Sequence, residues 1–355
     1  MSQTDVELKV VSEAGLDGAK ALRPRPEPKP PWLKVRAPGG ENYTKLKKTL
    51  RELDLYTVCE EARCPNVAEC WASGTATVML LGHTCTRGCR FCAVTTGNPK
   101  GAVDPREPDH VARAISGLSL RYVVLTMVDR DDLLDGGAEH VARTVKALKV
   151  LRPDLLVETL VGDFRGRRWD VETVVDARPD VFAHNIEVSR RLTPLIRDKR
   201  CSYDVSLEVL RQAKALAPER LTKSSIMVGI GETDEEVVTT LQDLRSAGVD
   251  VVTLGQYLRP TEKHAELHRY VTPEQFKEFE RIGLELGFSY VASGALVRSS
   301  YHAAEAFMAA RIGTPGSSAG PTEALPEARL PRSASESGQG VLLPASSLVR
   351  RPLSV

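Results

Sequence analysis

Three cysteines lie close together in the motif C-x3-C-x2-C: Cys85, Cys89 and Cys92. The motif directly follows a short apolar run, Thr77–Leu81. Three thiolates at this spacing can hold three irons of a cubane [4Fe–4S] cluster. The fourth iron is then left without a protein ligand, so a small molecule can bind there. The motif therefore predicts an iron–sulfur cluster with one open iron.

A zinc site is the alternative for this segment. Structural zinc takes four ligands in a closed tetrahedron, and His83 could join the three cysteines as the fourth. The aromatic Phe91, just before the last cysteine, suits a loop that wraps a cluster and packs against a flat cofactor. We favour the cluster over zinc.

A second triplet lies upstream in the motif C-x4-C-x5-C: Cys59, Cys64 and Cys70. A zinc knuckle or a set of buried free thiols is the alternative, but the triplet contains no histidine as a fourth zinc ligand. We favour a second cluster whose fourth ligand comes from elsewhere in the chain. The seventh cysteine, Cys201, has no partner nearby in sequence and is interpreted as structural or incidental.

The composition is that of an ordinary globular protein of 355 residues. Its 48 Lys and Arg balance 47 Asp and Glu, so charge gives no reason to expect nucleic acid or a membrane surface as partner. The N-terminus has no apolar core typical of a signal peptide, and the apolar stretch Val78–Leu81 is too short to span a bilayer. We therefore expect a cytoplasmic protein with reduced thiols.

The elements that must position the motifs alternate between strands and helices. Short apolar runs predict strands over Thr77–Leu81, Tyr122–Thr126, Leu155–Leu160, Val181–Ile186, Lys223–Val228 and Val251–Leu254. Apolar spacing of three and four predicts helices that include His140–Leu151, Tyr203–Leu216, Glu235–Ala247 and Pro273–Leu286. The pattern favours a buried parallel sheet, either open or curled into a barrel, with the active site in the loops that follow the strands.

The first motif resembles the cluster loop of the radical S-adenosylmethionine superfamily, in its position after a strand as well as in its spacing. The resemblance implies that the open iron chelates the amino and carboxylate groups of S-adenosylmethionine. One electron would cleave this cofactor, giving a 5′-deoxyadenosyl radical that removes a hydrogen atom from the substrate. It also implies the fold class: α/β, a partial (β/α)6 TIM-type barrel with N-terminal and C-terminal extensions.

From Pro28 to about Ala303 the chain resembles the lipoyl synthases. The combination of two cysteine triplets with a late Arg-Ser-Ser-Tyr segment is specific, whereas no single element is. Besides the triplets, the matching segments are residues 31–36, 128–132, 184–187, 227–233 and 298–301.

The resemblance implies that the second serine of Arg-Ser-Ser-Tyr, Ser300, is the fourth ligand of the auxiliary cluster. An alkoxide is a harder and less usual iron ligand than a thiolate. An alkoxide ligand would suit the iron that is released when the cluster gives up sulfide. Without the resemblance, Arg298–Tyr301 would be interpreted as a capped turn that opens a last helix.

The implied activity is that of a sulfurtransferase, which inserts sulfur at C6 and C8 of an octanoyl chain linked to a carrier lysine. The implied cofactors are two [4Fe–4S] clusters and S-adenosylmethionine, with the auxiliary cluster as sulfur donor. Implied partners are octanoylated lipoyl domains (2-oxoacid dehydrogenase E2 subunits and glycine cleavage H protein), an electron donor such as ferredoxin or flavodoxin, and an iron–sulfur carrier protein. Alternatives are a tRNA methylthiotransferase-like or biotin synthase-like radical enzyme, and a non-catalytic zinc or iron–sulfur protein.

Several residues at the strand ends are candidates to hold S-adenosylmethionine. Glycines after a strand let backbone approach a nucleoside, although a tight strand-to-helix turn explains them equally well. Arg197 could meet a carboxylate, although a surface arginine is the default interpretation. Together with Phe91, the candidates are Asp129, Glu158, Asn185, Arg197, Gly229 and Gly231.

The expected organisation has five segments. A proline-rich disordered tail, 1–30, precedes an N-terminal extension with the auxiliary cysteines, 31–75. The barrel spans 76–290, the segment that supplies the serine spans 291–312, and 313–355 is a second disordered tail. We interpret His264 and His268 as surface residues. The basic run Lys45, Lys47, Lys48 and Arg51 is a solvated helix face or a contact for an acidic carrier domain.

Overall fold

The computed structural model describes residues 28–33, 44, 56–57, 64, 66, 70, 75–118 and 120–301. The chain divides into two compact units, residues 1–31 and residues 32–355. Of the first unit, the structure describes residues 28–31 only. Cys59, the basic run before it and almost all of both predicted tails lie outside the described residues.

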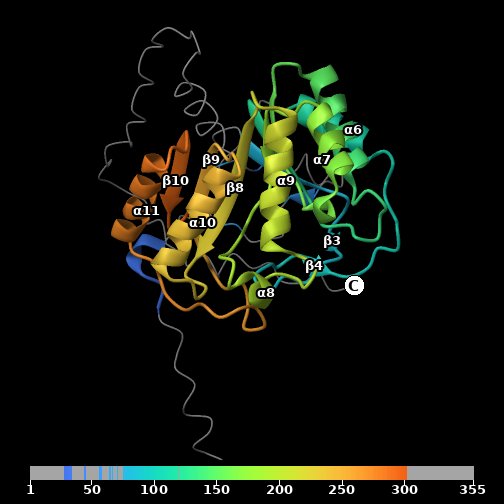
Figure 1. Ribbon diagram of the computed structural model, residues 1–355. Helices are drawn as coiled ribbons and strands as arrows, with labels where there is room; N and C mark the ends of the chain where they lie inside the picture. Colours follow the sequence, from blue (N-terminus) through green and yellow to red (C-terminus); the bar gives the residue numbers. More distant parts are fainter. Residues whose placement is uncertain are drawn as a thin grey trace, which may run out of the picture. The chain divides into compact units, whose positions relative to one another are not determined.

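One eight-stranded sheet dominates the described part of the second unit (Figure 1). Its order, β1-β2-β5-β6-β7-β8-β9-β10, follows the chain, so each parallel strand pairs with the one formed before it. The short β1 (Tyr56–Thr57) runs antiparallel to β2 at one edge. The parallel strands are β2 (Thr75–Leu80), β5 (Tyr122–Met127), β6 (Leu156–Leu160), β7 (Val181–Ala183), β8 (Leu221–Val228), β9 (Val251–Gln256) and β10 (Tyr290–Gly294).

Helices fill the connections between these strands. They are α5 (Glu107–Ser116), α6 (Ala138–Leu151), α7 (Arg168–Asp176), α8 (Thr193–Ile196), α9 (Tyr203–Leu216), α10 (Asp234–Ser246) and α11 (Pro273–Glu285). Strand order that follows chain order, with helices in each crossover, is the arrangement of a barrel rather than of a doubly wound sheet. The predicted α/β partial barrel is confirmed. β10 adds a seventh parallel strand, and α5, α7 and α8 are additional to the helices named in the prediction.

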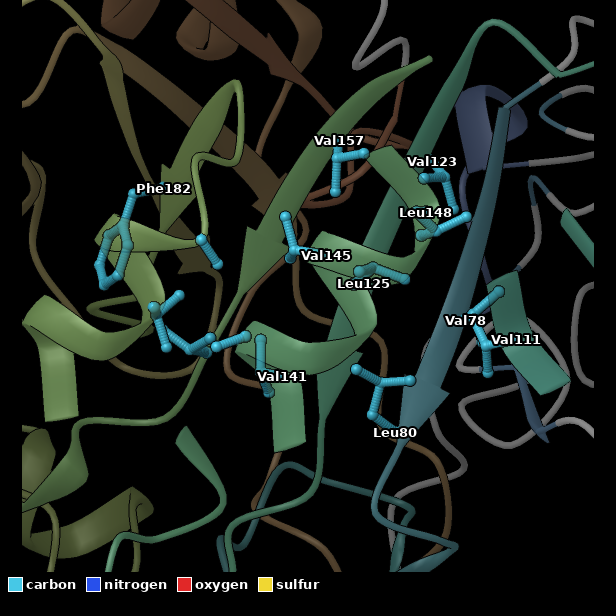
Figure 2. Packing of buried hydrophobic residues seen from close by; sticks show 14 of the residues in the cluster. Val78, Leu80, Val111, Val123, Leu125, Val141, Val145, Leu148, Val157 and Phe182 are labelled. Carbon is cyan, nitrogen blue, oxygen red and sulfur yellow. The ribbon is translucent and has the colours of Figure 1, made fainter. Parts of the chain in front are cut away.

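The main core lies between the sheet and the outer helices. Strand residues alternate between the two faces of the sheet: Val123 and Leu125 of β5 pack toward the helices, whereas Tyr122 and Val124 belong to an inner cluster. Figure 2 shows Leu80, Val123, Leu125 and Val157 of the strands near Val141, Val145 and Leu148 of α6, and Val78 of β2 beside Val111 of α5. Burying each such side chain contributes about 1.5–3 kcal/mol.

Local signals fix where the helices start. The predicted capping box of α10 is present, since Thr233 accepts from the Glu236 amide and the Glu236 side chain accepts from the Thr233 amide. Thr272 caps α11 by accepting from the Gln275 amide, with Pro273 in the first turn. The predicted strand Val181–Ile186 is shorter than expected and ends at Ala183.

Candidate active site at the cysteine loop

The first triplet lies in a closed loop directly after β2, residues 84–96, which we call the cysteine loop. Its ends pair as two short parallel strands, β3 (Thr84–Cys85) and β4 (Thr95–Thr96). Inside the loop, the Cys92 amide donates to the Cys89 carbonyl at 3.1 Å. The loop therefore sits at the carboxyl end of the parallel strands, where barrel active sites lie.

Arg87, between the first two cysteines, ties this loop to the ends of two other strands. Its Nη1 and Nη2 donate to the Asp163 carboxylate, both at 2.7 Å, and its Nε and Nη2 donate to Asp131, both at 3.0 Å. Asp131 follows β5 and Asp163 follows β6. Burial works against ionisation of Asp131, but the hydrogen bonds from Arg87 lower its pKa to about 2. The pairing therefore persists at neutral pH.

Backbone amides already point at two of the thiols. The Arg87 amide donates to Cys85 Sγ at 3.4 Å, and the Asp198 amide donates to Cys89 Sγ at 3.3 Å. Burial raises the pKa of Cys85 to about 12 and also raises the pKa of Cys92. A metal must therefore displace protons from these thiols, as is usual for cysteine ligands. Half-buried thiols with amide donors fit an iron–sulfur cluster.

A zinc site at this loop would need His83 as its fourth ligand. Among the described residues, no three His, Cys, Asp or Glu side chains gather tightly enough to hold a single ion. His83, the potential fourth zinc ligand, is exposed. Phe91 packs against an apolar cluster that includes Ile196, Ile230 and Tyr257, so the residue before the third cysteine is joined to the segments after β7, β8 and β9.

Charged groups at the strand ends face the cysteine loop. Burial raises the pKa of Asp129 to about 6, although Arg87 lies 3.6 Å away and opposes this rise. Asn185 Nδ2 donates to Glu187 Oε1 at 3.0 Å. The negative charges of Glu187 and Asp129 both raise the pKa of Cys92. Sequence reasoning did not select Glu187. Its left-handed backbone, with φ of 69°, is a feature that only the structure reveals.

Arg197 is buried, which corrects its default interpretation as a surface residue. Its Nη1 donates to Ser206 Oγ at 2.8 Å, while its buried Nε has no hydrogen-bond partner among the described residues. The guanidinium also favours ionisation of Asp129 and Glu187. A buried cation with an unused donor, beside the cysteine loop, fits an anionic group of a bound cofactor.

Three of the predicted cofactor contacts have structural roles in the sheet or in the turn that follows it. Glu158 is fully buried in the sheet, where its oxygens accept from Lys223 Nζ at 2.8 and 2.9 Å and from the Tyr122 hydroxyl at 2.8 Å. Gly229 has φ of 93°, and a Cβ there would lie 2.2 Å from Gln256 Nε2. Gly231 also has a positive φ, 118°. The turn after β8 therefore needs glycine for its own packing.

Cys201 and His264 contact the cysteine loop, which adds to our interpretations of them as a structural or incidental cysteine and a surface histidine. The thiols of Cys201 and Cys89 share a hydrogen bond, which lowers the pKa of Cys201 to about 7 and raises that of Cys89. Arg87 Nη1 also donates to Cys201 Sγ at 3.5 Å. His264 Nε2 lies 3.0 Å from the Cys92 carbonyl oxygen. His268 is exposed, as expected.

The described part of the second triplet meets the Arg-Ser-Ser-Tyr segment. Cys64 and Cys70 are half-buried against the main core, and Asn66, between them, donates to the Leu296 carbonyl. Burial raises the pKa of Cys64, and the nearby Arg298 opposes that rise. At the other end of the segment, Ser300 Oγ accepts a hydrogen bond of 3.0 Å from Thr77 Oγ1 of β2.

A close backbone crossing holds this segment against the sheet. A Cβ on Gly255 of β9 would lie 2.2 Å from the Val297 carbonyl oxygen and 3.5 Å from Arg298 Nη1. Only glycine allows the chain to pass this near. Residues 296–300 therefore lie across the end of β9, at the same end of the strands as the cysteine loop.

Two family models match this chain. The Radical SAM superfamily model matches residues 79–244, and the model of the N-terminal domain of lipoyl synthase matches residues 10–64. A lipoyl synthase of Sorangium cellulosum is 66% identical over 325 residues, which cover 85% of this chain and 87% of that protein. This chain belongs to the lipoyl synthase family. The mitochondrial lipoyl synthase of Rattus norvegicus is 56% identical, covering 79% of this chain and 76% of that protein.

The lipoyl synthase family is part of the radical S-adenosylmethionine enzymes, so membership confirms the predicted S-adenosylmethionine and one [4Fe–4S] cluster. Among solved structures, the FeFe-hydrogenase maturase of Carboxydothermus hydrogenoformans is 12% identical, with a TM-score of 0.48 over 75% of this chain and 69% of that one. No helix in the described residues is long and apolar enough to cross a membrane.

Proposed function

We propose that this protein converts a protein-bound octanoyl-lysine to lipoyl-lysine by inserting sulfur at C6 and C8. In this member of the lipoyl synthase family, the observation that carries the proposal is the contact of Cys64 and Asn66 with residues 296–298, next to Ser300, which is bonded to β2. An unactivated C–H bond offers no acidic proton, so a radical cofactor has to perform the hard step.

We further propose the ligands of two clusters. Cys85, Cys89 and Cys92 would hold the radical cluster, and Cys59, Cys64, Cys70 and Ser300 would hold the auxiliary cluster. When bound, the first supplies the electron that cleaves S-adenosylmethionine, and the second supplies sulfide. The hydrogen bond from Thr77 would stabilise Ser300 in its deprotonated, iron-binding form.

The strand-end residues would position S-adenosylmethionine. The unused Nε of Arg197 would meet the cofactor carboxylate, and the Glu187 and Asp129 carboxylates would meet its cationic groups. Asn185 would orient Glu187 through their 3.0 Å hydrogen bond. We do not retain Glu158 as a cofactor contact, because Lys223 and Tyr122 occupy its oxygens.

The expected partners follow from this activity. They are octanoylated E2 lipoyl domains and glycine cleavage H protein, a ferredoxin or flavodoxin as reductant, and an iron–sulfur carrier that rebuilds the auxiliary cluster. We expect neither nucleic acid nor membrane as partner. A cytoplasmic location remains our prediction for this chain, because such a compartment keeps the thiols reduced.

The test is anaerobic turnover of an octanoylated lipoyl domain with S-adenosylmethionine and a chemical reductant. Mass spectrometry should show two sulfur atoms replacing two hydrogens, and the reconstituted protein should contain about eight irons per chain. S-adenosylmethionine cleavage without sulfur in the product would indicate a different radical enzyme. One or two zinc ions without iron would contradict the cluster assignment.

A further inference from the structure

The cysteine loop reaches the protein surface next to Cys89. Gly88 and Arg90, its two neighbours in the chain, are exposed, whereas Arg87 is buried. The other cysteines of the loop have no pair of exposed neighbours of this kind. The shortest covalent route from solvent to a cluster held by this loop therefore runs through Gly88 or Arg90.

Two segments flank the exposed part of the loop. On one side, the Arg90 amide donates to the Ile196 carbonyl at 2.7 Å, and the Gly88 amide donates to Asp198 Oδ2 at 2.8 Å. On the other side, the Ala265 amide donates to the Arg90 carbonyl at 2.8 Å. The segments 195–200 and 259–265 therefore form one continuous rim with the loop.

Exposed side chains on this rim are mostly cationic. We call them the Cys89 surface: Arg90, Leu195, Lys199, Arg200, Arg259 and Lys263. Arg90 Nη1 donates to the Leu195 carbonyl at 3.2 Å, and Leu195 itself is 54% exposed.

The acidic groups nearby cancel only part of this charge. Arg200 is paired with Asp198 at 2.7 Å and with Asp131 at 3.4 Å. The other four cations have no carboxylate partner among the described residues, and they face two exposed carboxylates on the same rim, Glu262 and Glu266. Cations around an exposed leucine suit an acidic protein partner. Opposite charges speed the association of the two proteins, and a small apolar contact stabilises the complex.

We propose that the Cys89 surface docks a small acidic ferredoxin, which reduces the cluster held by the cysteine loop. The inference rests on the proposed function and deepens it by placing one partner. One electron leaves the reduced iron–sulfur centre of the ferredoxin and enters the cluster of this protein, with no transfer of a proton or a group. Ferredoxins have potentials low enough for this role, and weak redox complexes need only a small interface.

The test compares two charge reversals of equal size. The variant Lys199→Glu with Lys263→Glu changes two rim side chains for which the described structure shows no ion pair. The control, Lys146→Glu with Lys277→Glu, changes two exposed lysines of α6 and α11. Each reconstituted protein is titrated with an acidic ferredoxin, and cluster reduction by that ferredoxin is followed by stopped-flow absorbance. Turnover is also measured with dithionite, which needs no docking.

For the rim variant we expect at least tenfold weaker ferredoxin binding, slower reduction by ferredoxin and a weaker dependence on salt. Iron content and dithionite-driven turnover should equal those of the parent and the control. Unchanged ferredoxin binding would overturn the proposal, as would a loss confined to binding of the octanoylated carrier. Failure of the proposed function is distinguishable, because the parent would then insert no sulfur with dithionite.

Discussion

Thr77 Oγ1 donates a hydrogen bond of 3.0 Å to Ser300 Oγ, joining β2 to a residue 223 positions later. This bond places the Ser300 hydroxyl at the sheet that carries the cysteine loop. We expect Ser300→Ala to keep the radical cluster and S-adenosylmethionine cleavage but to lose sulfur insertion. Iron content, cleavage products and product mass are the measurements. Full dithiolated product from this variant would show that Ser300 is not a ligand.

Thr77→Val tests the donor without touching the serine. Valine keeps the branched shape at this buried position but removes the hydrogen bond to Ser300. A bond to an ionised oxygen contributes about 1.5–3 kcal/mol, so sulfur insertion should slow by at least about tenfold. Thr77→Ser, which keeps the hydroxyl, should retain most of the rate. Equal rates of sulfur insertion for the valine and serine variants would show that the Thr77 hydroxyl does not assist Ser300.

Glu158 should matter for stability rather than for cofactor binding. Glu158→Gln leaves the buried Lys223 ammonium without its counter-charge, and breaking a buried pair in this way costs about 3–5 kcal/mol. Chemical denaturation measures that loss, and the double variant with Lys223→Met should recover part of it. Equilibrium binding of S-adenosylmethionine to the folded variant should be unchanged. A selective loss of this binding, with stability preserved, would restore our original prediction for Glu158.

His184 makes the fold sensitive to acid. Burial and the nearby Arg197 lower its pKa to about 4, and its ring nitrogens contact the Val161 carbonyl and Ser206 Oγ. Because the folded pKa lies below the unfolded value of about 6.5, the stabilisation is complete above that pH and is lost as the pH falls toward 4. The loss should approach about 3 kcal/mol. The free energy of unfolding of His184→Gln should lack this acid-dependent loss when it is measured from pH 7 to pH 4.5 and compared with that of the parent.

Local sequence patterns predict the parts of this molecule that depend on neighbours in the chain. The cysteine spacing, the capping box at Thr233 and the helix Tyr203–Leu216 are of this kind, because a helix turn or a loop involves only a few residues. The partners of Arg87 are not predictable in this way. Asp131 and Asp163 lie 44 and 76 positions away, and only the strand order brings them to one end of the sheet.

The same argument explains which contacts of the predicted site residues the sequence could not show. Alternation along β6 shows that Glu158 faces one side of the sheet, but not that Lys223, 65 positions later, arrives opposite it. Cys201 has no partner within its own segment, and its contact with Cys89 depends on how the 198–201 turn packs on the cysteine loop. Ser300 entered the prediction through family resemblance alone.

The sheet order also determines the order in which the strands can pair during translation. Each parallel strand can pair with the one already made, so the barrel can grow as the chain leaves the ribosome. The Thr77–Ser300 link spans 223 positions, which take roughly 10 to 45 seconds to translate at about 5–20 residues per second. Nascent chains therefore expose the early cysteines well before the proposed serine ligand exists. Loading of the auxiliary site would then be a late event, after the last strand has joined, and a truncated chain would carry thiols that cannot be completed into that site.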